Sequence, residues 1–470
     1  MAIQTGVIES INPATEEVLA RFDVMSDARV EAAVDQAHRA FLSWRGTPVA
    51  ERAARLRALA GLLRAKRDHY ARLITREMGK PITEAQAEIE KCAWACDYYA
   101  ENAAAFLADA VTPTNAKRSL VAFEPLGVVL AIMPWNFPFW QVIRFAAPAL
   151  VAGNGAVLKH ASNVPQSALA IEEAIREAEF PAGLLRTILV PGAAVEALIA
   201  DDRIRAITLT GSSDTGARIA SLAGRALKKT VLELGGSDPF IVLEDADLGQ
   251  AAVWAARART QNAGQSCIAA KRFIVQERVA DDFERRFADA VRALRVGDPL
   301  DPATQVGPLA RADLRDTLER QVRESVRRGA RVVVGGERIA GRGYFFMPTV
   351  LADVTEDMPV FREETFGPVA ALLRVKDPDD AVRVANDSPY GLGASIWTRD
   401  VSLGEALARR IEAGSVFINA MMSSDPRLPF GGVKRSGYGR ELSAFGIREF
   451  VNIQTVWVGP PERPAPTPAR

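Results

Sequence analysis

Residues 127–160 read GVVLAIMPWNFPFWQVIRFAAPALVAGNGAVLKH and contain the pattern that decides the fold. Two short apolar runs, 127–133 and 156–159, flank a segment, 141–153, that is long and apolar enough for a buried helix. Short apolar runs bounded by Gly or Pro are typical of buried strands, and the order strand, helix, strand favours parallel pairing. The stretch therefore predicts one β–α–β unit.

The same alternation continues along the chain. A helix is expected over 165–177, a strand over 187–190, a short helix around Val195, and a strand over 204–210 that runs into GSSDTG at 211–216. Repeated units of this kind predict an α/β fold with a doubly wound parallel sheet and helices on both faces. Ligands of such sheets bind beyond the carboxyl ends of the strands. We therefore expect three positions near strand ends to line one crevice: Asn136, Lys159 and Gly211.

A second α/β set is expected to begin near residue 230. Its candidate strands lie within 230–236, 272–275, 330–336, 367–375, 393–398 and 415–419. Helical runs such as 279–294 separate them. The first hundred residues read as helical, and a helix that begins near Pro81 carries Cys92 and Cys96 one turn apart. With no other Cys or His nearby, these two cysteines are interpreted as buried core residues rather than metal ligands.

The composition excludes several classes of protein. The 470 residues carry 58 Lys plus Arg and 58 Asp plus Glu, a balance that argues against nucleic-acid binding through bulk charge. No run of about 18 apolar residues appears, and the first residues lack a signal-peptide pattern, so neither a membrane helix nor secretion is expected. Three cysteines and three histidines argue against a disulfide scaffold, a metal site and a Ser-His-Asp hydrolase. We expect a cytoplasmic protein with a Pro-rich, disordered tail at 461–470.

Cys267 and Glu233 are the candidate reactive residues. Cys267 follows Gly-Gln-Ser in what reads as a loop, and a lone cysteine is either a core residue or, beside a base or a positive charge, a nucleophile. Glu233 ends an apolar strand next to two glycines, where a carboxylate is costly to bury without a function. The turn at 211–216 is either a plain glycine-rich turn or a phosphate site at a helix N-terminus.

The chain resembles the aldehyde dehydrogenase superfamily from about residue 8 to about residue 457. The motifs that carry the resemblance stand in the same order and spacing: PWNFPFW (134–140), LTGSSDTG (209–216), ELGG (233–236), GQSC (264–267), EETFGPV (363–369) and PFGGVKRSGYGRE (429–441). VLKHASNVP, LELGGSDPF and CIAAKRF are similar to the succinate-semialdehyde dehydrogenase branch. The resemblance implies a Rossmann-type cofactor domain, an α/β catalytic domain and a small β oligomerisation segment.

The resemblance also implies how these parts divide the chain. Residues 1–232 would form the NAD(P)-binding domain, to which 430–447 return, and 233–429 would form the catalytic domain. Residues 113–130 together with 448–460 would form the oligomerisation segment of a homodimer or homotetramer.

The family's catalytic roles fall on three residues. Cys267 matches the nucleophile that attacks the aldehyde to give a thiohemiacetal, and Asn136 with the Cys267 N–H matches the oxyanion hole. Departure of hydride to the nicotinamide leaves a thioester, and Glu233 matches the general base that activates water to hydrolyse it. The resemblance therefore implies an NAD(P)-dependent oxidation of an aldehyde, with succinate semialdehyde as the expected substrate.

Further positions match the family's contacts with its cofactor, NADP or NAD: Trp135, Lys159, Ser162, Gly211, Ser212, Gly216, Glu364 and Phe366. Lys159 matches the residue that binds the adenine ribose, and Glu364 the carboxylate on the nicotinamide ribose. Many NAD-preferring members have Glu where this chain has Ser162. A small neutral side chain does not repel a 2′-phosphate, so the pocket is expected to tolerate NADP.

Four residues match the substrate pocket. A semialdehyde carries a carboxylate about 4–5 Å beyond its aldehyde carbon, and its recognition requires an Arg or hydroxyl donors. Arg144 matches an arginine with this role, with a salt bridge as its other interpretation, and Ser424 matches a hydroxyl of the same pocket. Trp140 and Phe430 are expected to wall a narrow tunnel. Gln261 departs from the pattern, since some members have Arg there, so carboxylate binding is weaker or uses another group.

Several alternatives remain open. They are a dehydrogenase of another aliphatic or aromatic aldehyde, a catalytically silent structural member of the fold, a cysteine hydrolase, and a coenzyme A-acylating dehydrogenase. The intact Cys267, Glu233 and Asn136 argue against a silent protein. A hydrolase lacks a plausible His partner, because His160 follows Lys159 on the cofactor side.

Overall fold

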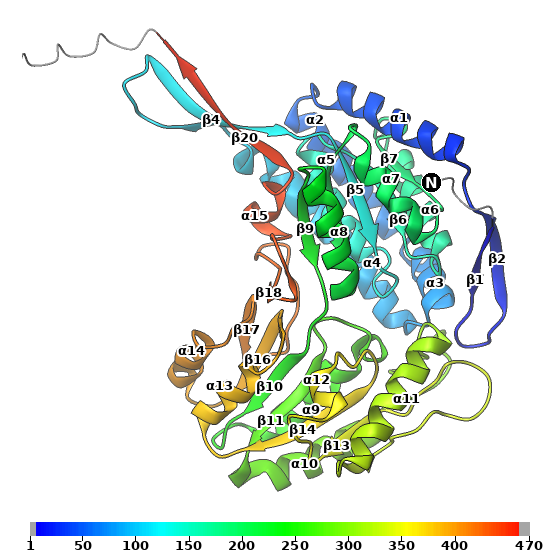
Figure 1. Cartoon of the computed structure of the whole chain (residues 1–470), viewed down its shortest axis with the longest axis vertical. Helices are drawn as coiled ribbons and strands as arrows, with labels where there is room; N and C mark the ends of the chain where they lie inside the picture. Colours follow the sequence, from blue (N-terminus) through cyan, green and yellow to red (C-terminus); the bar gives the residue numbers. More distant parts are fainter. Residues whose placement is uncertain (1–5, 460–470) are drawn as a thin grey trace, which may run out of the picture.

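A computed structural model describes residues 6–459 of the chain. The fold contains two α/β bodies, each built on its own sheet, and a narrow β arm that projects away from both (Figure 1). The first body fills the upper half of Figure 1, and the second, which runs from green to orange, fills the lower half. The α/β class expected from the sequence is confirmed.

Six strands form the sheet of the first body: β5 Val128–Met133, β6 Gly155–His160, β7 Leu185–Thr187, β8 Ile204–Thr210, β9 Lys229–Glu233 and β19 Gly437–Tyr438. Their spatial order is β19-β9-β8-β5-β6-β7, and all neighbours are parallel except β19 and β9. The chain forms β5 first, then β6 and β7 on one side of it, and then returns to form β8 on the other side of β5. A topological switch point therefore lies between β5 and β8.

Helices cover both faces of this sheet: α1 Asp27–Trp44, α2 Val49–Ala65, α3 Arg67–Met78, α4 Ile82–Phe106, α5 Trp140–Val151, α6 Pro165–Glu177, α7 Val195–Ala200, α8 Ser213–Arg225 and α15 Ser443–Ile447. Alternate residues of β5 point to opposite faces, as in any strand. Val129 and Ala131 join the cluster of α2, α4, α5 and α6, whereas Val128 and Leu130 join the cluster of α1, α7 and α8.

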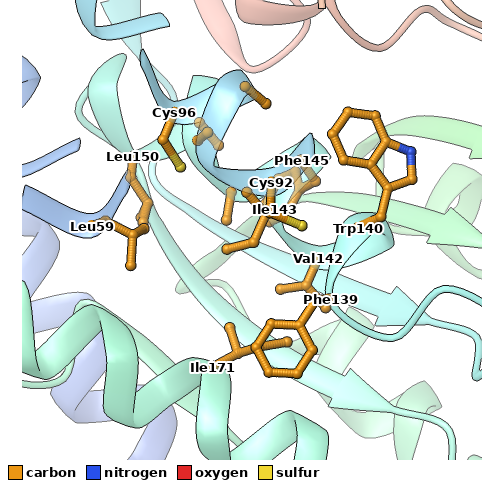
Figure 2. Close-up of a cluster of buried hydrophobic side chains, with 14 of the residues drawn as sticks. Leu59, Cys92, Cys96, Phe139, Trp140, Val142, Ile143, Phe145, Leu150 and Ile171 are labelled. Carbon is orange, nitrogen blue, oxygen red and sulfur yellow. The ribbon is translucent and has the colours of Figure 1, made fainter. Parts of the chain in front are cut away.

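The first of these clusters fixes the helices that later form the site. Every residue of α5 is buried. Cys92 and Cys96 of α4 are fully buried, and Figure 2 shows them among the apolar side chains of α5 and the neighbouring helices. The interpretation of both cysteines as core residues is therefore confirmed, and α4 and α5 are held rigidly side by side.

Seven strands form the sheet of the second body: β10 Asp238–Val242, β11 Ala270–Gln276, β12 Arg331–Val334, β13 Thr349–Ala352, β14 Val369–Val375, β16 Gly393–Trp397 and β17 Ser415–Ile418. Their order is β12-β13-β14-β11-β10-β16-β17, with only β12 antiparallel to its neighbour. The helices of this body are α9 Leu248–Thr260, α10 Glu277–Arg292, α11 Ala312–Arg327, α12 Pro359–Arg362, α13 Pro378–Asn386 and α14 Val401–Ala408.

The arm is a three-stranded antiparallel sheet of β3 Ala110–Val111, β4 Arg118–Pro125 and β20 Val451–Val458. β20 pairs with β4 along its whole length, from Val451 opposite Pro125 to Val458 opposite Arg118. A short pair, β15 Tyr390–Gly391 with β18 Val433–Lys434, connects the bodies near the site. Residues 460 and 461–470, the end of the expected oligomerisation segment and the expected disordered tail, lie outside the described residues.

Two expectations about the fold were wrong. Residues 7–23, expected to be helical, form the hairpin of β1 Val7–Ile11 and β2 Val18–Asp23. The second α/β set does not begin near residue 230, because β9 pairs with β8 and belongs to the first sheet. An apolar run shows that a strand is buried but not which sheet it joins, since pairing depends on tertiary contacts.

Candidate active site

Cys267 lies between two cavities that meet at its side chain. We call the first the strand-end cavity, because it lies beyond the carboxyl ends of β5, β8 and β9, and the second the helix-side cavity, because α4 and α5 line it. Their volumes are ≈ 240 Å³ and ≈ 340 Å³. Gln141 and Cys267 line both, so groups bound in the two cavities can meet at this sulfur.

The strand-end cavity gathers residues that are far apart in the sequence. Trp135 and Asn136 follow β5, Gly211 and Ser212 follow β8, and Gly235 follows β9. Parallel strands place their carboxyl ends along one edge, so these positions meet at the switch point between β5 and β8. Further residues complete the walls: Leu234, Arg311, Leu314, Glu364 and Phe366. The crevice expected from the sequence is present at Asn136 and Gly211.

The helix-side cavity is formed by two helix faces and by the segment before β18. α4 contributes Glu84, Glu88 and Lys91, and α5 contributes Trp140 and Arg144. Spacings of three and four residues place side chains on one side of a helix, which explains why each helix presents its set together. The remaining lining residues that matter here are Gln261, Ser424 and Phe430.

The loop that carries Cys267 has a strained backbone. Asn262, Ala263 and Gly264 follow one another with φ of 54°, 53° and 74°. Each non-glycine residue in this left-handed region costs on the order of 1 kcal/mol. A Cβ at Gly264 would lie 2.3 Å from the carbonyl oxygen of Gly367, so glycine is required at that position. This tight turn leads from α9 into the residues just before Cys267.

Two features hold the loop in place. Lys271 is fully buried and donates to the carbonyl oxygens of Ser266, Cys267 and Ala269, each at 3.1 Å. On the side of β9, a Cβ at Gly236 would lie 2.4 Å from the Cys267 carbonyl oxygen. The ELGG segment therefore needs glycine at 236, because the loop with the candidate nucleophile rests against its backbone.

Asn136 is bonded to the same loop. Its side chain is 4% exposed, and its Nδ2 donates to the Gln265 carbonyl oxygen at 3.0 Å. The Asn136 carbonyl oxygen in turn accepts from Asn262 Nδ2 at 2.7 Å. A side-chain amide nitrogen carries two hydrogens. One hydrogen therefore fixes the side chain, and the other is left to bind an oxygen atom beside Cys267.

The Cys267 side chain rests as a thiol. Desolvation raises its pKa to about 12, with the Glu364 and Glu233 carboxylates acting in the same direction, while the positive charges of Arg144 and Lys271 act against it. At neutral pH only the thiolate is a strong nucleophile. The sulfur therefore needs a nearby base, or a positive charge that arrives with a ligand, before it can react.

Glu233 lies next to a buried ion pair. Its carboxylate is 2% exposed and accepts no hydrogen bond from residues 6–459. Burial and then the charge of Glu441 raise its pKa to about 8, against the opposing charge of Arg144. Arg144 is itself ion-paired with Glu441. A carboxylate that gains and loses its proton near neutral pH, with no fixed partner, is suited to general base catalysis.

The strand-end cavity fits a dinucleotide. Ser212 caps α8, with its Oγ accepting the N–H of Thr215 at 3.3 Å, so the N-terminus of that helix opens at the cavity and favours a phosphate. Glu364 accepts the N–H of Gly236 at 2.9 Å and keeps its second oxygen for a hydroxyl. Nearby, the ring of Phe366 meets Trp135 edge to face at 5.7 Å, giving an apolar wall.

Three residues matched to the cofactor lie outside the walls of this cavity. Lys159 is half-buried near the end of β6, its pKa is lowered by burial, and no carboxylate of the described chain lies within 4.0 Å of its amine. Ser162 is exposed two residues beyond the same strand. Gly216 packs α8 against β9, since a Cβ there would lie 2.5 Å from Leu234 Cδ1. An unpaired amine at the same sheet edge also fits a phosphorylated ligand.

All four residues expected in the substrate pocket line the helix-side cavity: Trp140, Arg144, Ser424 and Phe430. The Arg144 guanidinium lies 4.7 Å from the ring centroid of Phe430, and its Nη2 donates to Thr210 Oγ1 at 3.4 Å. The salt-bridge interpretation of Arg144 also holds, through Glu441. Arg144 thus borders the cavity with its charge already balanced.

Sequence reasoning missed four residues of the site: Lys91, Gln141, Lys271 and Arg311. Lys91 and Gln141 lie on helices whose residue spacing indicates packing, and packing alone does not show which polar residue faces a cavity. The signal available for Lys91 was its spacing from Glu84 and Glu88 on one helix face. Lys271 could have been found from its place in a buried strand, where a lysine needs partners.

Two further findings concern residues 6–459. Within that range, no group of three or more His, Cys, Asp and Glu side chains is placed to hold a metal ion. No helix in the same part of the chain has both the length and the apolar character needed to cross a membrane.

Comparisons with known proteins agree with this geometry. A family model described as the aldehyde dehydrogenase family matches residues 2–456. A protein of Synechocystis sp. (strain ATCC 27184 / PCC 6803 / Kazusa), named probable succinate-semialdehyde dehydrogenase NADP(+), is 53% identical over 451 residues, which cover 96% of this chain and 99% of that one. The succinate-semialdehyde dehydrogenase NADP(+) of Mycobacterium avium (strain 104) is 52% identical over 456 residues, covering 96% and 97%.

A solved structure shows the same likeness in three dimensions. The crystal structure of succinic semialdehyde dehydrogenase from Streptococcus pyogenes, in complex with NADP+, superposes with a TM-score of 0.94 and 42% identity. The match covers 96% of this chain and 99% of that one. The likeness therefore extends over both bodies and the arm rather than over one domain.

Proposed function

Because the chain belongs to the aldehyde dehydrogenase family, we propose that it oxidises succinate semialdehyde to succinate with NADP+ as the hydride acceptor. The observation that carries the proposal is that Cys267 joins a cavity suited to a dinucleotide with a cavity suited to a small aldehyde. The names of the Synechocystis, Mycobacterium avium and Streptococcus pyogenes relatives support both the substrate and the cofactor.

The first half of the reaction uses Cys267 and Asn136. The Cys267 thiol gives its proton through water to the solvent, the resulting thiolate attacks the aldehyde carbon, and the carbonyl oxygen becomes an oxyanion. The free Nδ2 hydrogen of Asn136 and the Cys267 N–H donate to that oxygen, and one such donor contributes about 3 kcal/mol to transition-state stability. When bound, NADP+ supplies the acceptor for the hydride that leaves the same carbon. The carbonyl reforms, and the acyl group stays on Cys267 as a thioester.

The second half uses Glu233. Its carboxylate lines neither cavity and has no hydrogen-bond partner among the described residues, so no hydrogen bond must break when it turns toward the thioester. It takes a proton from water, the water oxygen attacks the thioester carbon, and the carbon–sulfur bond breaks. Succinate leaves, and the protonated Glu233 returns its proton to the Cys267 sulfur for the next cycle. The raised pKa of Glu233 makes it a stronger base, once ionised, than an exposed carboxylate.

Cofactor binding uses the carboxyl edge of the first sheet. The α8 N-terminus at Gly211 and Ser212 would hold the pyrophosphate, Glu364 would bind a ribose hydroxyl, and Trp135 and Phe366 would give the nicotinamide an apolar wall. Lys159 and Ser162 would bind the adenine ribose and its 2′-phosphate. In the proposed function, residues 1–232 with 430–447 form the cofactor domain, and residues 233–429 form the catalytic domain.

We also propose that the chain works as a homodimer or homotetramer joined through the β arm. The arm projects from the bodies (Figure 1). It exposes apolar side chains that a monomer would leave in water. Ile453 is 64% exposed and Trp457 is 48% exposed, and both lie on β20. The three free cysteines, one of them the nucleophile, favour a cytoplasmic location, where thiols stay reduced.

The proposed function is tested by initial rates with succinate semialdehyde, acetaldehyde and benzaldehyde, each with NADP+ and NAD+. We expect the highest kcat/KM for succinate semialdehyde with NADP+. The Arg144→Ala variant is expected to lose kcat/KM for all three aldehydes, because it breaks the ion pair beside Glu233. Equal or higher kcat/KM for benzaldehyde in the wild type would assign the enzyme to aromatic aldehydes instead.

A further inference from the structure

The helix-side cavity contains several charged side chains, and most of them are already balanced. Arg144 is ion-paired with Glu441, and Glu88 is ion-paired with Lys80 inside the protein. Glu88 also accepts the backbone N–H groups of two α5 residues, each at 2.9 Å. These pairs are buried, so they contribute little net charge to a ligand in the cavity.

Glu84 also contributes less than one full negative charge to the helix-side cavity. Its Oε2 accepts the N–H of Asn262 at 2.7 Å, and burial raises its pKa to about 7. Gln261, which also lines the cavity, is neutral. Arg257 lies on the same wall, but its side chain is exposed and stacks on the ring of Trp254, 5.2 Å from the centroid, so water screens its charge.

Lys91 is the one cavity cation in the described chain that is both partly buried and without an ion partner. No carboxylate among residues 6–459 lies within 4.0 Å of its amine. Its Nζ donates to Ser424 Oγ at 2.7 Å and lies 4.5 Å from the ring centroid of Trp140. An ammonium has three hydrogens, so two remain for a ligand after the bond to Ser424.

The surroundings disfavour the charged form of the Lys91 side chain unless an anion lies beside it. Burial, followed by the positive charge of Arg144, lowers the pKa of Lys91 to about 8, although Asp425 and Glu88 act in the opposite direction. Because it is poorly solvated, the Lys91 ammonium is stabilised more by an anionic ligand than the ammonium of an exposed lysine is. The hydroxyl of Ser424 beside it supplies a second, neutral donor or acceptor.

We propose that Lys91 is a further residue that binds the carboxylate of the semialdehyde and that its charge selects a carboxylated substrate over a neutral aldehyde. The inference rests on the proposed function and deepens it. Lys91 supplies the charge, Ser424 completes the hydrogen bonding, and Trp140 holds the lysine through its ring face. Arg144 borders the same cavity with its charge balanced by Glu441, so Lys91 adds the unbalanced positive charge there.

The test compares succinate semialdehyde with butanal, which has the same chain length and no carboxylate. We expect Lys91→Met to lower the ratio of kcat/KM for succinate semialdehyde over butanal by about 10- to 100-fold, as for loss of a charged hydrogen bond. Lys91→Arg, which keeps the charge, should restore most of the ratio. Arg257→Met, a matched removal of a cation from the cavity rim, should change the ratio less than about threefold.

Binding of succinate to the enzyme gives a readout that does not need turnover. Isothermal calorimetry should show Lys91→Met binding succinate about tenfold or more weakly than the wild type does. An unchanged ratio and unchanged succinate affinity in Lys91→Met would overturn the inference, as would an equal loss in Arg257→Met. A wild type with no preference for succinate semialdehyde over butanal would instead overturn the proposed function.

Discussion

The strand-end cavity and the helix-side cavity meet at Cys267, yet they are built from different parts of the fold. In the strand-end cavity, Asn136, Gly211 and Gly235 come just after parallel strands, and backbone pairing fixes their positions. In the helix-side cavity, Lys91 and Arg144 come from α4 and α5. Other side chains of these two helices, such as Cys92 and Ile143, pack in the core (Figure 2).

This difference separates two tasks. Backbone pairing fixes the sheet edge at which we propose that the cofactor and the oxyanion donor lie, and this pairing depends little on any single side chain. A helix face can change one side chain without moving its neighbours, because the core on the other side holds the helix. We infer that the chemistry is carried by the strand ends and that the choice of aldehyde is carried by the helix faces.

The largest effect is expected where the cavities join. Asn136→Ala removes a donor to the oxyanion, so kcat should fall by about 10²- to 10³-fold. Because the oxyanion forms on every aldehyde, the loss should be equal for succinate semialdehyde and butanal in steady-state assays. A fall in kcat for succinate semialdehyde alone would show that Asn136 takes part in substrate selection. It would contradict the division of tasks between the two cavities.

A second prediction concerns the contact between β9 and the Cys267 loop. Gly236→Ala would place a Cβ 2.4 Å from the Cys267 carbonyl oxygen, so the loop must shift. Misplacing a nucleophile by about 1 Å costs about 10²-fold in rate, and we expect that loss in kcat with either aldehyde. Gly192→Ala, whose Cβ would meet nothing within 4 Å, is the matched control and should keep wild-type rates. Full activity in Gly236→Ala would show that this contact does not position the sulfur.

A third prediction concerns the preference for NADP+ over NAD+. Ser162→Glu places a negative charge near the expected 2′-phosphate, and repulsion should lower kcat/KM for NADP+ relative to NAD+ by about tenfold. The ratio for succinate semialdehyde over butanal should stay constant, whereas Lys91→Met should change that ratio and leave nucleotide preference unaltered. A change of both preferences in either variant would contradict two separate cavities.

The smallest effect is a pH dependence. Glu233 must be ionised to act as a base, and its pKa is raised to about 8, so the active form increases as the pH rises through that value. Where hydrolysis limits turnover, kcat should rise about threefold between about pH 7.5 and about pH 8.5. Stopped-flow measurement of the NADPH burst separates this step from acylation, in which the Cys267 thiol also ionises. A kcat that falls over this range would contradict Glu233 as the base.

Local sequence patterns pointed to the strand ends for a physical reason, whereas Trp140 and Arg144 on the helix face followed only from the family resemblance and Lys91 was missed. Asn136, Glu233 and Cys267 stand beside strand termini or in a glycine-rich loop, where a local pattern shows that a polar residue has left the regular structure. The positions of β5, α6 and β8 also followed from local patterns.

Features that depend on long-range contacts were not predictable. Nothing near β9 shows that it joins the first sheet, and nothing near Arg144 shows that Glu441, almost three hundred residues later, balances its charge. Lys91 is one of many charged helix residues until α5 and Ser424 are placed beside it. The departure at Gln261 indicated only that carboxylate binding is weaker or uses another group.

The central claim is that one sulfur atom serves both cavities. The direct test mixes the Glu233→Gln variant, which in the proposed mechanism lacks the base for thioester hydrolysis, with NADP+ and succinate semialdehyde, and then maps the covalent adduct by mass spectrometry. We predict one NADPH per subunit in the first turnover and one succinyl group on Cys267. NADPH formation without an adduct, or an adduct on another residue, would contradict the account.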